Sequence, residues 1–495
     1  MPESFKLTRI PSLKTVEAFR AHVASLGVEI PCGDAIATEA SPIAEPLSGL
    51  KINGKILGNR IALQPMEGWD GTTDGRVTEA VRRRWRRFGE SGAKLICGAE
   101  AMAVRPDGRA NPMQLLISDA TKGDLVELRE ILLAAHREKF DGTDDLAIGF
   151  QLTHSGRFCR PNDKFTYEPK VAYRHPILDG KVCVSGDEAI MTDDEVGILI
   201  GDFVRAARVA KEAGADFVDL KHCHGYLLHE FLGAHTRPGR YGGSFENRTR
   251  ILREIVAGIR AEGNDLDLAV RLSAFDLVPH RPDPSRAQPG KLGPGIPEAH
   301  ETPYPFQFGL DHDDPTRIDL TEAFAFARLC GELGIKLLNI SAGSPYYTPH
   351  IQRPAAYPPS DGYQPAHDPL IDVARQMDAV RQLKAQLPAG MAVVSSALSY
   401  LQEYLPQVCQ ALLREGWTDL VGLGRVVLSY PDILSDAMKS GALNKKSICR
   451  TFSDCTTAPR MGLPSGCFPL DEFYSKSDAA VELKAKKRRA KPAGE

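Results

Sequence analysis

Short runs of apolar and β-branched residues alternate with longer amphipathic stretches along most of the chain. This alternation is typical of parallel strands joined by crossover helices. The stretches between the runs, such as residues 194–214 and 320–334, end on glycine, which terminates helices well. We expect eight of the apolar runs to form strands: residues 60–66, 93–101, 146–154, 216–224, 268–275, 336–343, 391–398 and 419–426.

Eight strand–helix units predict an α/β protein, a closed (β/α)8 TIM barrel with its active site at the carboxyl ends of the strands. The alternative is an open, doubly wound sheet. Such a sheet normally carries a G-x-G-x-x-G turn after its first strand, and residues 67–76, EGWDGTTDGR, contain none. The pattern therefore favours the barrel.

Several segments lie outside the repeating unit. We expect loop insertions after the third and fifth strands, at residues 158–190 and 277–316; the first of them could fold as a hairpin lid. The predicted organisation is an N-terminal extension (1–44), the barrel (45–446), a Cys-containing C-terminal cap (447–474) and a basic, flexible tail (475–495).

Composition narrows the functional classes. Hydrophobic residues make up 42% and charged residues 25% of the chain, which excludes a disordered main body, and the net charge of -3 gives no field for nucleic acid or a membrane. The ten cysteines mostly stand singly in apolar runs, the N-terminus lacks a signal-peptide pattern, and no run of eighteen apolar residues occurs. We expect a cytoplasmic protein with a small-molecule substrate, and leave a homo-oligomer open.

Polar residues gather at the carboxyl ends of the predicted strands, where inward-facing side chains of a barrel carry function. Residues 395–397, together with the Gly-Arg pair at 424–425, offer backbone N–H groups and a guanidinium where barrels commonly bind phosphate. The polar strand ends are Gln64, Glu67, Glu100, Gln151, His154, Lys221, His224, Tyr226, Arg271 and Arg425.

Six motifs occur in a fixed order between residues 59 and 425: NRIALQPM, AEAMAVRPDGR, QLTHSGR, HGYLLHEFL followed by RYGGSFENRTR, VRLS, and DLVGLGR. In these motifs the chain resembles the Old Yellow Enzyme family of FMN-dependent oxidoreductases, in particular ene-reductases and the barrel domain of 2,4-dienoyl-CoA reductase. The resemblance implies FMN as cofactor and NADH or NADPH as electron donor. It also implies hydride transfer through flavin N5 to an electron-poor acceptor such as an α,β-unsaturated carbonyl.

The same resemblance implies a set of cofactor contacts. Arg271 would lie near N1 and O2 of the flavin, where a fixed cation stabilises the charge of the reduced ring. The other implied contacts are Pro65, Met66 and Glu67 along the flavin, Ala101 at its polar edge, Gln151 at its pyrimidine end, and Ala397, Gly424 and Arg425 at the phosphate.

The fourth strand would hold the substrate. In the family a His and a second His or Asn three residues later bind the acceptor oxygen, and a Tyr two further on donates a proton. Here these positions are Lys221, His224 and Tyr226, so the first His is replaced by Lys. Lys221 could bind an oxyanion or a substrate carboxylate, or pair with Glu67. His222 has the wrong parity to face the flavin, and we expect a structural role.

Some relatives bind a four-iron cluster through C-x2-C-x3-C-x11-C after the eighth barrel unit. Cys455 and Cys467 match the last two of these ligands, but Ile448 and Thr451 occupy the first two positions, and Cys449 is out of register. A cubane needs four thiolates or a substitute. We therefore predict no iron–sulfur cluster and no metal site.

Three alternatives remain at this stage. The enzyme could run in the oxidative direction, as a flavin-dependent dehydrogenase or demethylase. Lys221 could attack a carbonyl as a Schiff-base nucleophile, which would make the protein a lyase. The basic run at residues 484–491 could instead belong to a flavin-bearing subunit that relays electrons to a partner.

Overall fold

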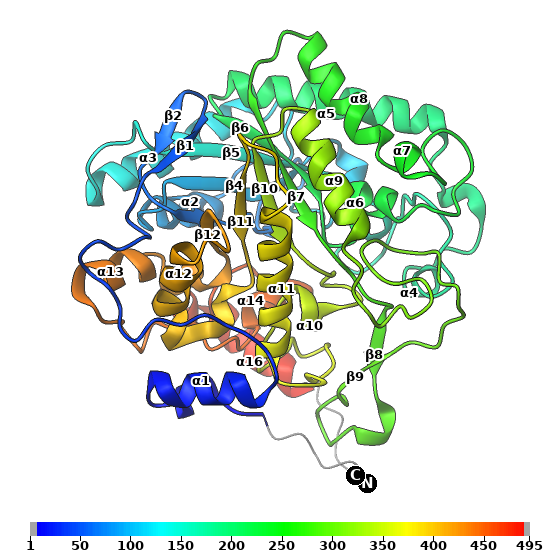
Figure 1. The fold of residues 1–495 in the computed structure, drawn as a ribbon. Coiled ribbons are helices and arrows are strands. Elements are labelled where there is room, and N and C mark those ends of the chain that lie inside the picture. Colours follow the sequence, from blue (N-terminus) through cyan, green and yellow to red (C-terminus); the bar gives the residue numbers. More distant parts are fainter. Residues whose placement is uncertain (1–6, 490–495) are drawn as a thin grey trace.

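Eight parallel strands form a closed barrel in the computed structural model, which describes residues 7–489 (Figure 1). Around the barrel the strands follow chain order, with β12 paired to β3 to close the ring. Both the barrel and the eight predicted strands are confirmed. The strands are β3 (Ile61–Leu63), β4 (Leu95–Ala103), β5 (Ala147–Thr153), β6 (Phe217–His222), β7 (Asp267–Ser273), β10 (Leu337–Ser341), β11 (Ala392–Ser395) and β12 (Leu420–Leu423).

One helix follows each barrel strand and packs on the outside. The predicted glycine stops are confirmed at Gly214 and Gly334, whose φ values of 84° and 72° lie in the left-handed region that glycine adopts without strain. The outer helices are α2 (Glu79–Gly89), α3 (Lys122–Lys139), α5 (Asp193–Glu212), α8 (Arg250–Ala261), α9 (Thr321–Glu332), α11 (Pro369–Lys384), α12 (Leu405–Arg414) and α13 (Ile433–Ser440).

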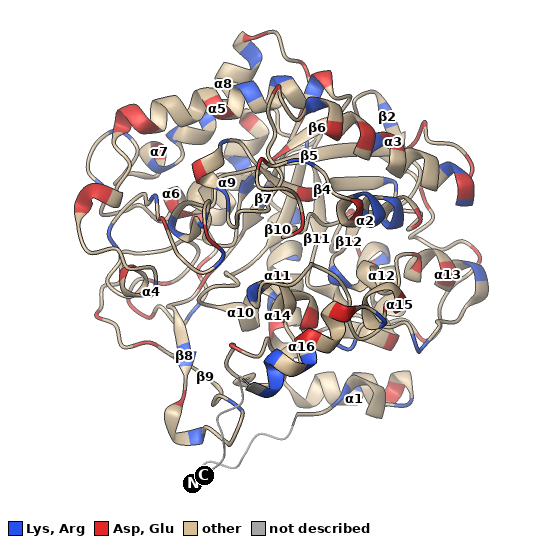
Figure 2. Ribbon diagram, turned by 180° about the vertical axis from the view of Figure 1, so that it is seen from behind, with Lys and Arg blue, Asp and Glu red and all other residues tan. Residues whose placement is uncertain are grey.

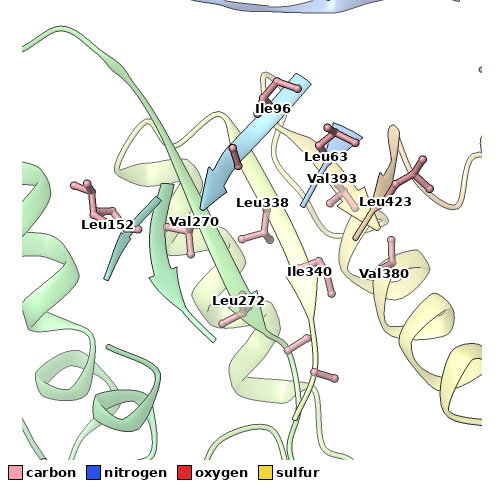
Figure 3. Packing of buried hydrophobic residues seen from close by; sticks show 14 of the residues in the cluster. Leu63, Ile96, Leu152, Val270, Leu272, Leu338, Ile340, Val380, Val393 and Leu423 are labelled. Atoms are coloured by element: carbon pink, nitrogen blue, oxygen red, sulfur yellow. The ribbon is translucent and has the colours of Figure 1, made fainter. Parts of the chain in front are cut away.

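Alternate residues of each strand enter two different cores. Outward-facing residues such as Leu63, Val270 and Leu338 belong to the hydrophobic layer between the strands and the outer helices, to which Val380 of α11 also contributes (Figure 3). Inward-facing residues such as Phe217 fill the floor of the barrel. Since side chains alternate along a strand, the parity that turns Phe217 inward also turns Asp219 and Lys221 inward, above the floor.

A hairpin covers the amino-terminal end of the barrel. Its strands are β1 (Leu47–Ile52) and β2 (Lys55–Leu57), whose buried side chains join the floor of the barrel. Lys55 pairs with Asp216 at 2.8 Å, which ties the hairpin to the start of β6. The hairpin therefore covers the end of the barrel opposite the carboxyl ends of the strands.

The insertions after β5 and β7 cover part of the opposite end. The first contains helix α4 (Leu178–Lys181) and a 3-10 helix at Asp187–Ala189 but no β-strand, so the expectation of a hairpin at residues 158–190 is wrong. Its Arg157 is buried against Asp179 and Glu230, and this anchor replaces strand pairing. The hairpin lies instead in the second insertion, where β8 (His280–Pro282) pairs with β9 (Gly295–Pro297).

The described part of the predicted tail is more ordered than expected. We predicted a flexible tail from residue 475, but residues 478–489 form helix α16 (Asp478–Arg489) (Figure 1). Leu483 of this helix is buried in a cluster with Phe468 of the cap. Several residues of α16 are basic (Figure 2), and one of them, Lys487, pairs with Asp454 at 2.6 Å. Residues 490 and 491 of the predicted basic run lie outside the described residues.

The remaining helices are short segments at the two termini and at the strand ends. Within the described residues, no helix is long and apolar enough to cross a membrane. These helices are α1 (Val16–Ser25), α6 (Leu227–Leu232), α7 (Phe245–Arg248), α10 (Pro349–Gln352), α14 (Asp454–Arg460) and α15 (Glu472–Ser475).

Candidate active site

A cleft opens at the carboxyl ends of the barrel strands and continues under the C-terminal cap. Loop residues that the sequence did not single out, including Trp69, Tyr346 and Arg353, line it as well. Ten of the twelve predicted site residues line the same cleft: Pro65, Met66, Glu67, Lys221, His224, Tyr226, Arg271, Ala397, Gly424 and Arg425.

Tyr226, Glu67 and Lys221 form a connected group at one end of this cleft. The Tyr226 hydroxyl donates a hydrogen bond to the Glu67 carboxylate and lies 3.0 Å from the hydroxyl of Tyr346. Lys221 Nζ is 3.7 Å from Glu67 Oε2 and 3.8 Å from the centre of the Tyr226 ring. The pairing of Lys221 with Glu67 that the sequence suggested is therefore present.

The surroundings of Tyr226 keep its proton in place. Burial and the neighbouring Glu67 carboxylate raise the pKa of Tyr226 well above its usual value, because both disfavour a phenolate. Burial lowers the pKa of Lys221, although the Glu67 carboxylate opposes this by favouring the ammonium form. At neutral pH the phenol therefore keeps its proton, with the Lys221 side chain beside it.

The two histidines of this strand end differ as their parity predicts. His224 lines the cleft, and its Nε2 lies 2.9 Å from Ser341 Oγ; burial and the cation of Arg271 hold the pKa of His224 well below its usual value. His222 turns outward, with its ring centre 5.5 Å from that of Phe326 in α9. The neutral imidazole of His224 is therefore available to the cleft, whereas His222 packs between the barrel and a helix.

Arg271 and Gln151 have donors and acceptors with no protein partner. Arg271 Nη1 donates to the Pro65 carbonyl at 3.1 Å, but its buried Nε meets no partner within residues 7–489. Gln151 Nε2 donates to Asp219 at 2.7 Å, and its buried Oε1 has no partner there either. Buried polar groups are rarely left unpaired, so these atoms fit a ligand with its own donors and acceptors.

Gln151 and Ala101 are the two predicted site residues that do not line the cleft. They face one another across β4 and β5, next to an irregularity in the strand pairing between Gly98 and Ala101. Both are fully buried. Their assignment to the flavin stays a prediction.

The other end of the cleft is strongly basic. Arg425 donates to Thr456 Oγ1 and lies 3.5 Å from Cys455 Sγ, while Arg353 Nη1 donates to Ser453 Oγ at 2.8 Å. The buried Nε and Nη2 of Arg353 have no partner among the described residues. A Cβ added at Gly424 would find its nearest atom at 3.9 Å, so the backbone there is open to a ligand. Two guanidiniums beside open backbone suit the phosphate group of FMN.

A buried ion-pair network supports the loop after β3. Arg84 of α2 pairs with Asp70 at 2.6 Å and with Glu100 at 2.7 Å, and burial raises the pKa of Glu100. The sequence placed Glu100 at the polar end of a predicted strand. It could not tell which arginine of residues 82–87, RRRWRR, would pair with this carboxylate. The backbone of Met66 forms an isolated parallel β-bridge with that of Glu100. The ion-pair network therefore helps to position the segment that carries Met66 and Glu67.

The cysteines of the cap show no metal-binding arrangement in the described part of the chain, where no group of three or more His, Cys, Asp or Glu could hold an ion. Burial opposes ionisation of Cys455, yet the cations of Arg425 and Arg353 lower the pKa of its thiol overall. The absence of an iron–sulfur cluster remains a prediction from the missing ligands at Ile448 and Thr451.

The closed barrel and its polar cleft define a (β/α)8 enzyme with a cofactor-sized site at the carboxyl ends of the strands. The sequence profile of the NADH:flavin oxidoreductase / NADH oxidase family matches residues 45–287. An NADPH dehydrogenase of Geobacillus sp. (strain WCH70) is 28% identical over 387 residues, which cover 77% of this chain and 89% of that protein.

Solved structures share the fold. A complex of 2-naphthoyl-CoA reductase with 2-naphthoyl-CoA is 18% identical with a TM-score of 0.63, covering 88% of this chain and 57% of that one. An old yellow enzyme homologue from Zymomonas mobilis is 20% identical with a TM-score of 0.53, covering 82% of this chain and 94% of that one. Over residues 45–287 the chain is thus similar to the NADH:flavin oxidoreductase / NADH oxidase family, and this similarity, with that to the NADPH dehydrogenase, supports an FMN-dependent oxidoreductase that uses NADH or NADPH.

Proposed function

We propose that the protein uses NAD(P)H to reduce the carbon–carbon double bond of an α,β-unsaturated carbonyl compound. The observation that supports this most is the buried, protonated phenol of Tyr226, which lies in the cleft beside Lys221 and His224. Reduction of such a bond adds a hydride at the β carbon and a proton at the α carbon. It therefore needs an acid at this place.

The cleft offers fitting contacts for the cofactor at two places. Arg353 and Arg425 would hold the phosphate, and Arg271 would stabilise negative charge on the flavin ring. When bound, FMN accepts a hydride from NADH or NADPH and delivers it to the acceptor.

The acceptor would be bound and protonated by three side chains, those of Lys221, His224 and Tyr226. Lys221 and His224 would bind the carbonyl oxygen, where negative charge develops during the reaction. Tyr226 would give its proton to the α carbon, and the Glu67 carboxylate keeps the phenol oriented through the hydrogen bond that it accepts. Water from the cleft mouth would return the proton afterwards.

The same geometry speaks against two of the alternatives. An oxidative reaction would need a base, whereas burial and Glu67 disfavour the phenolate of Tyr226. A Schiff-base lyase would need Lys221 as a free amine. Burial lowers the pKa of Lys221. Its pairing with Glu67 and its place over the Tyr226 ring both favour the cation and so oppose this reaction. Borohydride in the presence of substrate should therefore trap no adduct on Lys221.

The experiment is an absorbance spectrum of the purified protein, followed by anaerobic titration with NADPH and NADH and then by addition of 2-cyclohexenone. We expect flavin bands that bleach with the donor and return with the enone, with cyclohexanone as product. A colourless protein that cannot be reconstituted with FMN would contradict the proposal. So would a reduced flavin that no enone reoxidises.

A further inference from the structure

Four arginines of the cleft have no carboxylate partner within the described residues: Arg160, Arg271, Arg353 and Arg425. Other cations of the cleft are paired, as Lys221 is with Glu67 and Arg460 with Asp361. Arg160 and Arg271 are buried, and Arg353 and Arg425 are partly buried. A cation that is withdrawn from water without a counter-charge is costly, so these four arginines favour an anionic ligand.

Three of these four arginines are explained by the cofactor assigned above. Arg353 and Arg425 lie at the phosphate end, and Arg271 lies at the carboxyl end of β7, where charge develops on the reduced flavin. Arg160 is different because it belongs to the insertion after β5 and lies near Tyr226 and Glu67. It faces the part of the cleft that we assign to the acceptor.

Arg160 is held firmly although no acidic side chain binds it. Only 8% of the residue is exposed. Its guanidinium carbon lies 4.7 Å from the centre of the Trp69 ring and 5.0 Å from that of Tyr167, a cation–π sandwich. Two backbone carbonyls hold the guanidinium of Arg160 in place. Its Nε donates a hydrogen bond to the carbonyl oxygen of Ala110 at 3.2 Å, and its Nη1 donates one to the carbonyl oxygen of Lys164 at 3.1 Å.

This arrangement leaves one edge of the guanidinium for a ligand. Nη2 of Arg160 donates to no group within residues 7–489. Burial alone would lower the pKa of Arg160, but the neighbouring Tyr346, Tyr167 and Glu67 raise it overall, so the cation persists. Glu67 itself is already engaged by Tyr226 and Lys221.

We propose that Arg160 binds a carboxylate of the acceptor, so that the substrate is an α,β-unsaturated carbonyl compound with a second, anionic group apart from the reacting double bond. This inference rests on the proposed function. The aromatic walls of Trp69 and Tyr346 would pack against the apolar part that joins the two groups. Lys221 and His224 would still bind the carbonyl oxygen.

The first test measures binding without turnover. Calorimetry compares 7-oxooctanoate, a saturated keto acid that cannot be reduced at a double bond, with its methyl ester on the FMN-loaded enzyme. We expect the keto acid to bind more tightly than the ester, and Arg160→Met to weaken acid binding about 10- to 100-fold with little change for the ester. Arg160→Lys should restore part of the affinity. Arg286→Met, which removes an exposed arginine paired with Asp283, is the matched control.

The second test separates the two half-reactions. Stopped-flow kinetics follow flavin reduction by NADPH, and then reoxidation by (E)-7-oxooct-5-enoate or by its methyl ester. In Arg160→Met the ratio of kcat/KM for acid over ester should fall about 10- to 100-fold, while reduction by NADPH stays unchanged.

The outcomes are distinct. Equal loss for acid and ester would overturn the proposal and leave Arg160 a purely structural role. A defect confined to reduction by NADPH would also overturn it and would assign Arg160 to a phosphate of the donor. If neither enone is reduced but keto acid binding still depends on Arg160, the carboxylate site is supported and the proposed ene-reduction fails instead.

Discussion

The two ends of the cleft handle charge in opposite ways. At the carboxyl end of β6 the cation of Lys221 is paired with Glu67 and linked to Tyr226, so that charge is balanced within the protein. Under the cap, Arg353 and Arg425 meet only hydroxyls and a thiol among the described residues. Internal pairing suits a group that moves protons, whereas unpaired cations suit a ligand that brings its own charge.

The difference also explains the pKa directions at the two ends. Beside Glu67, the pKa of the Tyr226 phenol rises and the acid keeps its proton. Beside Arg425, the pKa of the Cys455 thiol falls although desolvation opposes this change. One carboxylate and two guanidiniums thus give the two ends of one cleft opposite preferences for charge.

The largest expected effect is on the proton donor. Tyr226→Phe should slow reoxidation of the reduced enzyme by an enone about 10²- to 10⁴-fold, the usual contribution of general acid catalysis. Stopped-flow absorbance measures this rate. Reduction by NADPH serves as the internal control and should be nearly unchanged. An unaltered rate with the enone would remove Tyr226 from the chemistry.

Next is the phosphate end. Arg353→Met and Arg425→Met should each weaken FMN binding about 10- to 100-fold, since each removes a charge-assisted contact. Titration of the apoprotein, followed by flavin fluorescence, gives the dissociation constant. Lys221→Met is the comparison from the other end and should retain FMN. If all three variants lost affinity for FMN to the same extent, the two ends of the cleft would not differ in their contribution to FMN binding.

The pairing of Lys221 with Glu67 gives a smaller effect that depends on pH. The Glu67 carboxylate raises the pKa of Tyr226, so Glu67→Gln should lower that pKa. The alkaline decline of kcat/KM for the enone, where the acid is lost, should therefore begin at a lower pH than in the wild type. Tyr346→Phe keeps the carboxylate and should shift the profile less. A profile of Glu67→Gln that coincides with that of the wild type would contradict this account of Tyr226.

The smallest effect concerns the cap. Iodoacetamide should alkylate Cys455 faster than Cys449, because the pKa of Cys455 is lowered while burial raises that of Cys449. Arg425→Met should slow labelling of Cys455 about threefold to tenfold, because it removes a cation that lowers the pKa of this thiol. Mass spectrometry of timed digests measures both sites. Faster labelling in this variant would mean that access, and not charge, controls the thiol.

Much of this arrangement could be predicted from the sequence. Side chains alternate between the inside and the outside of a barrel along each strand, and the order of the strands follows the order of the chain. The inward position of Lys221, the outward one of His222 and the contact of Lys221 with Glu67 follow from the alternation of side chains. Loops carry no such periodicity, so the places of Arg353 and Tyr346 were not foreseen.

Two expectations failed because they concern packing between distant segments. The basic composition of the last residues predicted a flexible tail, whereas Leu483 buries its side chain against the cap and orders α16. The hairpin expected after β5 did not form, since Arg157 anchors that insertion through Asp179 and Glu230. Ion pairs between remote elements leave no periodic trace in a single sequence.

The most direct test of the account is the reduction of an enone in D2O with unlabelled NADPH, with the product examined by NMR. If Tyr226 supplies the proton, deuterium from the solvent enters at the α carbon, and Tyr226→Phe forms the α-deuterated product far more slowly. A product without deuterium at the α carbon, or an unchanged rate of α-deuteration in Tyr226→Phe, would contradict the assignment of Tyr226 as the acid.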